Sequence, residues 1–149
     1  MERNRLLGMI IGVVAVVSLT VVVVSALGGD DPQLDRDTPE GVVQAYVTAI
    51  AEEKWADAHA LFTPELAERC RVSDLSLDRR DNISRVSIDD VQVTDSTAVV
   101  DVVVTYAEVD DPLTTSSWDE DVTFVLVDEG GWVFDEVTWP YFPCRWDEP

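Results

Sequence analysis

The sequence is poor in basic residues and in side chains that commonly perform catalysis. Lys plus Arg total 10 against 30 Asp plus Glu, which gives a formal net charge of −20. A surface this acidic repels phosphate backbones, which argues against nucleic-acid binding. There is one histidine, and no nucleophile motif built on Ser or Cys accompanies it. The apolar fraction of 46% nevertheless supplies enough material for a folded core.

Charge is missing altogether from the run between Leu6 and Leu27. A helix over this run would be about 33 Å long, which matches a bilayer core of about 30 Å. Arg3 and Arg5 precede the run and acidic residues follow it, so the positive-inside bias places residues 1–5 in the cytoplasm. We therefore expect a single-pass transmembrane helix, a signal anchor in the cell membrane, with the C-terminal domain outside.

Two alternatives concern this apolar run. Val24-Ser25-Ala26 resembles a signal-peptidase site, so cleavage after Ala26 competes with an uncleaved anchor. Gly8 and Gly12 form a GxxxG pair, which could bring two copies of the helix together in a homodimer.

Residues 28–37 read as a polar linker, and residues 38–149 as one domain that begins with helices. Thr38-Pro39-Glu40 and Thr63-Pro64-Glu65 each provide a cap, a proline suited to the first turn and an acid. The expected helices run from Pro39 to about Glu53, from Trp55 to Phe62 and from Pro64 to about Cys70, with a loop at 71–82.

From Ile83 onward the hydrophobic period changes to two, which predicts antiparallel strands. A break in phase at Asp89-Asp90 indicates a bulge. The expected strands cover about 83–93, 97–107, 118–127 and 132–139, with a loop at 110–117. About three helices packed on a curved antiparallel sheet of about four strands is an α+β fold.

Two segments carry a resemblance to a known family. Thr38–Leu66 (TPEGVVQAYVTAIAEEKWADAHALFTPEL) has a capped helix with a central aromatic, then a short turn and an Ala-rich second helix. Gly130–Trp139 (GGWVFDEVTW) has a tight turn and an aromatic that opens the last strand. In these features the chain resembles the NTF2-like superfamily, in its SnoaL-like and cystatin-like-fold branches. It is also similar to membrane-anchored actinobacterial envelope members such as Mce-associated proteins.

The resemblance implies a cone-shaped space between the first helix and the sheet. The superfamily includes enzymes, such as isomerases and dehydratases, and noncatalytic modules, so it does not by itself fix an activity. Its enzymes work inside the cone with Tyr, Asp or His side chains. Tyr46 on the first helix and Asp101, an acid among strand valines, are the catalytic candidates. The alternative places Tyr46 in the core and Asp101 on the solvent face.

Cys70 and Cys144 lie near the two ends of the outer domain. In an oxidising compartment they are expected to form one disulfide. It would close a loop of about 75 residues and stabilise the fold by about 4 to 4.5 kcal/mol in the chain-entropy model. The alternative is two unrelated buried thiols.

Other polar and aromatic groups have simpler interpretations. His59 is expected on the surface or partly packed. The acids at 110–111 and 119–121 are expected to belong to a solvated acidic loop that binds no metal. Asn82 begins a glycosylation sequon, which is relevant only in a eukaryotic secretory pathway. C-terminal aromatics form either a binding patch or core: Trp118, Trp132, Trp139, Tyr141, Phe142 and Trp146.

The anchor, the small domain and the lack of a catalytic constellation favour a noncatalytic module that binds another envelope protein or supports an assembly. No cofactor is expected. One alternative is a pocket that holds an apolar small molecule or lipid. The other is a SnoaL-like isomerase or dehydratase.

Overall fold

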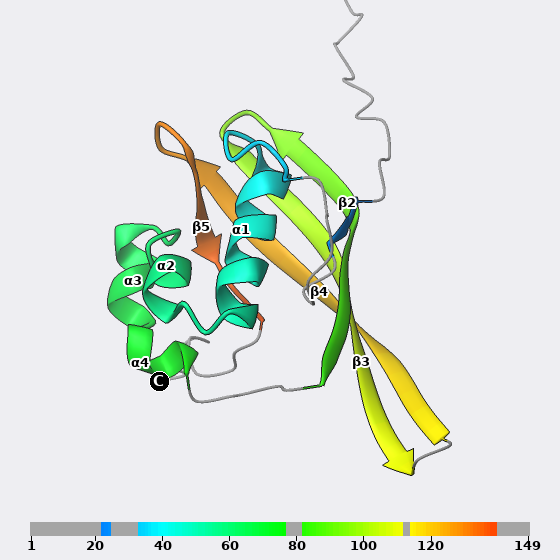
Figure 1. Cartoon of the computed structure of the whole chain (residues 1–149). Coiled ribbons are helices and arrows are strands. Elements are labelled where there is room, and N and C mark those ends of the chain that lie inside the picture. Colours follow the sequence, from blue (N-terminus) through cyan, green and yellow to red (C-terminus); the bar gives the residue numbers. More distant parts are fainter. Residues whose placement is uncertain (1–21, 25–32, 77–81, 112–113, 140–149) are drawn as a thin grey trace, which may run out of the picture.

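A computed structural model describes residues 22–24, 33–76, 82–111 and 114–139 of the chain. Helices lie beside an antiparallel sheet in which neighbouring strands follow one another along the chain (Figure 1). The helices are α1 (Pro39–Ala51), α2 (Trp55–His59), α3 (Pro64–Arg69) and α4 (Val72–Leu75). The strands are β1 (Val22–Val24), β2 (Ile83–Thr94), β3 (Thr97–Asp111), β4 (Thr114–Asp128) and β5 (Trp132–Glu136). The expected α+β class is confirmed.

The two Thr-Pro-Glu signals start helices as predicted. The side chain of Thr38 accepts a hydrogen bond from the Gly41 amide, and that of Thr63 accepts one from the Leu66 amide, each at 3.2 Å. These bonds satisfy amide groups that have no partner within the first turn. Gly41 is also required for packing, because a Cβ at this position would collide with the carbonyl group of Asp35.

The sheet has one apolar face, and α1 lies across it (Figure 1). Alternate residues in the middle of the central strands point to this inner face and are buried: Ala98, Val100, Val102, Val104 and Tyr106 on β3, and Val122, Phe124 and Leu126 on β4. The register between β2 and β3 shifts between Ile88 and Asp90, where the sequence predicts the bulge.

The β5 edge of the sheet is covered by the chain's own backbone. Phe62 forms a parallel bridge with Phe134. The amide of Phe134 donates to the carbonyl oxygen of Leu61, and the amide of Thr63 donates to that of Phe134, both at 2.8 Å. The segment between α2 and α3 thus blocks this edge against further strand pairing.

Two of the predicted loops are wrong. Val72–Leu75 form α4, and Asp74 Oδ2 accepts a hydrogen bond from the Arg71 amide at 2.8 Å, which caps this short helix. The segment has no apolar periodicity from which a helix could be predicted. The expected loop at 110–117 is largely strand, because β3 continues to Asp111 and β4 begins at Thr114. Cross-strand partners such as Val109 and Thr115 are β-branched and extend the hairpin.

The last strand is also shorter than predicted, because β5 ends at Glu136 and not at Trp139.

The expected membrane helix falls mostly outside the described residues. Within it, Val22–Val24 form β1 and not a helix, and they pair antiparallel with Val86–Ile88 at the β2 edge. Consecutive β-branched valines favour a strand wherever an open sheet edge offers hydrogen bonds. In the part of the chain that is described, no helix is long and apolar enough to cross a bilayer.

Replacing Val102 by Ala will lower the free energy of unfolding by about 2 kcal/mol, because the lost methyl groups leave a cavity in a buried site. Val102 is 1% exposed on the inner face, whereas its neighbour Val103 is half-buried on the outer face. Val103→Ala is therefore a chemically matched control, with an expected loss below about 1 kcal/mol. Urea denaturation of the full chain in mild detergent measures both losses, and equal losses would contradict the assigned faces.

Candidate functional site

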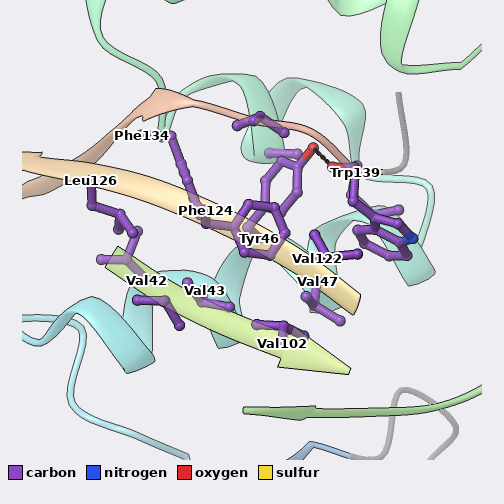
Figure 2. Close-up of a cluster of buried hydrophobic side chains, with 14 of the residues drawn as sticks. Val42, Val43, Tyr46, Val47, Val102, Val122, Phe124, Leu126, Phe134 and Trp139 are labelled. Carbon is purple, nitrogen blue, oxygen red and sulfur yellow. Dashed lines mark hydrogen bonds between the residues drawn. The ribbon is translucent and has the colours of Figure 1, made fainter. Parts of the chain in front are cut away.

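Aromatic side chains fill the space between α1 and the sheet. Tyr46 projects from α1 and is fully buried, with its ring centroid 4.9 Å from that of Phe134 and 5.9 Å from those of Phe62 and Phe124 (Figure 2). Trp139, which follows β5, is 2% exposed beside them. The described residues therefore give no support to an apolar ligand pocket at Tyr46.

Three hydrogen bonds lead from this aromatic cluster toward solvent, and we call them the buried hydrogen-bond chain. The Tyr46 hydroxyl donates to the carbonyl oxygen of Trp139 at 3.0 Å. The indole Nε1 of Trp139 donates to the Tyr106 hydroxyl at 2.9 Å. That hydroxyl donates in turn to Glu120 Oε2 at 2.7 Å, and Glu120 is half-buried. The chain links α1, β3, β4 and the segment after β5.

The two catalytic candidates do not meet. Asp101 lies between Val100 and Val102, whose side chains are buried on the inner face, so its own side chain is on the outer face. There it accepts a hydrogen bond from Thr123 Oγ1 at 2.6 Å. Because the sheet separates Asp101 from Tyr46, the described residues give the enzyme hypothesis no support either.

His59 stabilises a helix end. Its Nε2 lies 2.8 Å from the carbonyl oxygen of Cys70 and 3.2 Å from that of Ala67. Both partners accept hydrogen bonds, so Nε2 carries a proton and donates to carbonyl groups at the C-terminal end of α3. This role fits the partly packed histidine that the sequence predicts.

Cys70 is fully buried at the C-cap of α3 and is not a free thiol. Its expected partner, Cys144, lies outside the described residues. The Cys70–Cys144 disulfide therefore stays a prediction.

The acids of β4 do not converge on one point. Asp119 and Asp121 lie on the outer face, where Thr105 Oγ1 donates to Asp119 Oδ1 at 2.7 Å, whereas Glu120 lies on the inner face. Among the residues with described side chains, no group of three or more His, Cys, Asp or Glu side chains is placed to hold a metal ion.

A shallow depression of about 510 Å³ lies between α3 and the end of β5. Its lining is polar and mostly acidic: Glu65, Glu68, Arg69, Asp135 and Glu136. This lining does not suit the apolar ligand that the sequence offers as an alternative.

One part of the β3–β4 hairpin extends beyond the end of β2, and we call it the arm. It comprises Ala107–Asp111 and Thr114–Ser117, and it projects away from the helices (Figure 1). The amide of Ala107 donates to the carbonyl oxygen of Asn82 at 2.8 Å, which ties down its base. Val109 in the arm is 72% exposed. Val109 is the most exposed of the large apolar side chains among the described residues, and the arm is therefore the candidate contact surface.

Trp118 sits at the base of the arm on the inner face. It is 44% exposed, and one side of its indole stacks on Tyr106, with centroids 5.4 Å apart and an interplanar angle of 19°. The proposed aromatic patch is thus divided. Trp139 belongs to the core, Trp132 packs at its margin and Trp118 faces solvent, while Tyr141, Phe142 and Trp146 lie outside the described residues.

Sequence reasoning missed the arm because Asp110 and Asp111 resemble loop residues. The β-branched residues Val109, Thr114 and Thr115 were the signal that could have located it. Comparisons with family models, curated proteins and solved structures give no match to this chain.

Tyr106→Phe will lower the free energy of unfolding by about 1–3 kcal/mol, because it leaves the buried indole N–H of Trp139 without its acceptor. Thr123→Val is the matched control, since it also removes one hydroxyl that donates to a carboxylate, but on the exposed face. Its expected effect is within about 0.5 kcal/mol. Denaturation curves of the two variants compare them, and a Tyr106→Phe loss no larger than that of the control would contradict the buried hydrogen-bond chain.

Proposed function

We propose that this protein is a single-pass membrane protein whose acidic, NTF2-like domain lies outside the cytoplasm and binds another envelope protein without catalysing a reaction. The membrane part of the proposal is supported by the uncharged run from Leu6 to Leu27 and by the arginines that precede it. The binding part is carried by one observation, the arm with its exposed Val109.

The arrangement of the interior supports binding at the surface over binding inside the fold. Tyr46 and Trp139 fill space between α1 and the sheet, where an NTF2-like enzyme would be expected to have its pocket, and their polar atoms take part in the buried hydrogen-bond chain. A ligand in that space would have to displace buried aromatic rings. The arm, by contrast, presents its side chains to a partner without any rearrangement of the core.

Location and contact surface are testable together with Val109→Cys in the full chain. Intact host cells are treated with a membrane-impermeant reagent that carries a maleimide and a photoactivated diazirine. We expect the cysteine at 109 to be labelled from outside and, on illumination, to crosslink to a defined protein. Val93→Cys is the control, because Val93 is 46% exposed at the far end of the sheet from the arm.

The control should be labelled equally well but should give no defined crosslink. Labelling of both variants only after lysis would contradict the outward location. Labelling of both from outside, with no more crosslinking at 109 than at 93, would contradict the arm as the contact surface.

A further inference from the structure

The inner face at the base of the arm brings an exposed indole and two carboxylates together. In the β3–β4 register Tyr106 is opposite Trp118, and Glu108 is opposite Ser116. Side chains of directly paired residues share a face, as do residues two apart on one strand. Glu108, Trp118 and Glu120 are therefore neighbours on the same face as the buried Tyr106.

The indole of Trp118 is held flat by its stack on Tyr106, so its remaining surface is a fixed aromatic platform. Glu120 is positioned as well, because its Oε2 accepts the hydrogen bond of the Tyr106 hydroxyl. Both groups are thus oriented by one buried tyrosine at the outer end of the buried hydrogen-bond chain. A platform ordered in advance loses little conformational entropy when a ligand binds.

The second carboxylate comes from the other strand. Glu108 is exposed, and it lies diagonally across the strand pair from Trp118, a spacing of about 7–8 Å that long side chains can bridge. Trp118 is therefore flanked by one carboxylate on its own strand and one on β3. A negatively charged rim around the face of an indole favours a cation.

We infer that this surface binds an arginine side chain from a basic segment of the partner protein. A guanidinium is planar, so it can stack on the indole of Trp118 while its N–H groups reach the exposed carboxylate of Glu108. Lysine and a metal ion supply charge, but neither has a planar group that can stack on the indole. The net charge of −20 also attracts a basic partner over longer range. The inference rests on the proposed function and specifies the chemistry of the partner.

Binding of fluorescent octa-arginine to the full chain in nonionic detergent tests this site. Salt near 0.15 M shortens the reach of the overall charge to about 8 Å, so local contacts dominate the measured affinity. The variants are Trp118→Leu and Glu108→Gln. The control is Asp121→Asn, which removes the same charge from an exposed residue on the outer face of β4. Octa-lysine serves as the matched peptide.

We expect Trp118→Leu to weaken octa-arginine binding about 3- to 10-fold and Glu108→Gln about threefold. Asp121→Asn should change it by less than about 1.5-fold, and octa-lysine should respond less to Trp118→Leu than octa-arginine does. Glu108 is exposed, so its variant keeps the test valid even if Trp118→Leu fails to fold.

Equal weakening by Glu108→Gln and Asp121→Asn would overturn the inference, because it would mean that only total charge is sensed. If neither Trp118→Leu nor Glu108→Gln weakens octa-arginine binding while crosslinking at position 109 is intact, the arginine site is rejected and the proposed function stands. If both variants weaken octa-arginine binding but position 109 gives no defined crosslink, the arm is rejected as the contact surface and the arginine site stands.

Discussion

The arrangement of this protein depends on the buried hydrogen-bond chain that joins Tyr46, Trp139, Tyr106 and Glu120. Each buried polar atom in the chain would destabilise the fold if it lost its partner. Together the bonds hold α1 and the segment after β5 against the two longest strands. They also keep the ring of Tyr46 packed against Phe124 and Phe134 in the space between α1 and the sheet.

The β2 edge and the arm differ in how far they are protected against pairing with an unrelated strand. The β2 edge carries Arg85, Asp89 and Asp90, charges that discourage pairing with an unrelated strand. Val22–Val24 pair with this edge in β1, yet the same valines fall within the proposed membrane helix. The two uses exclude each other, so a chain inserted in the bilayer leaves this edge without β1. The arm also carries acids, Glu108, Asp110 and Asp111, but it exposes the apolar Val109, and Trp118 is exposed at its base.

Sequence patterns predicted the parts of the fold that depend on local chemistry. Thr38 and Thr63 located two helix starts, and alternation up to Tyr106 located the inner face of β3. The sequence did not predict the arm, because Asp110 and Asp111 favour turns. The pairing that keeps this part of the chain in a strand comes from β4. Nothing local could reveal that Tyr106 serves both Trp139 and Glu120, because those contacts join residues far apart in the chain.

Hydrogen exchange at the tryptophan side chains, followed by NMR on the full chain with labelled indole nitrogens, tests the closed interior most directly. The account predicts that the indole N–H of Trp139, which is 2% exposed and bonded to Tyr106, exchanges as slowly as core amides, while that of Trp118 exchanges rapidly. Similar rapid exchange at Trp139 and Trp118 would mean that solvent enters the space beneath α1, and it would contradict an interior closed to ligands.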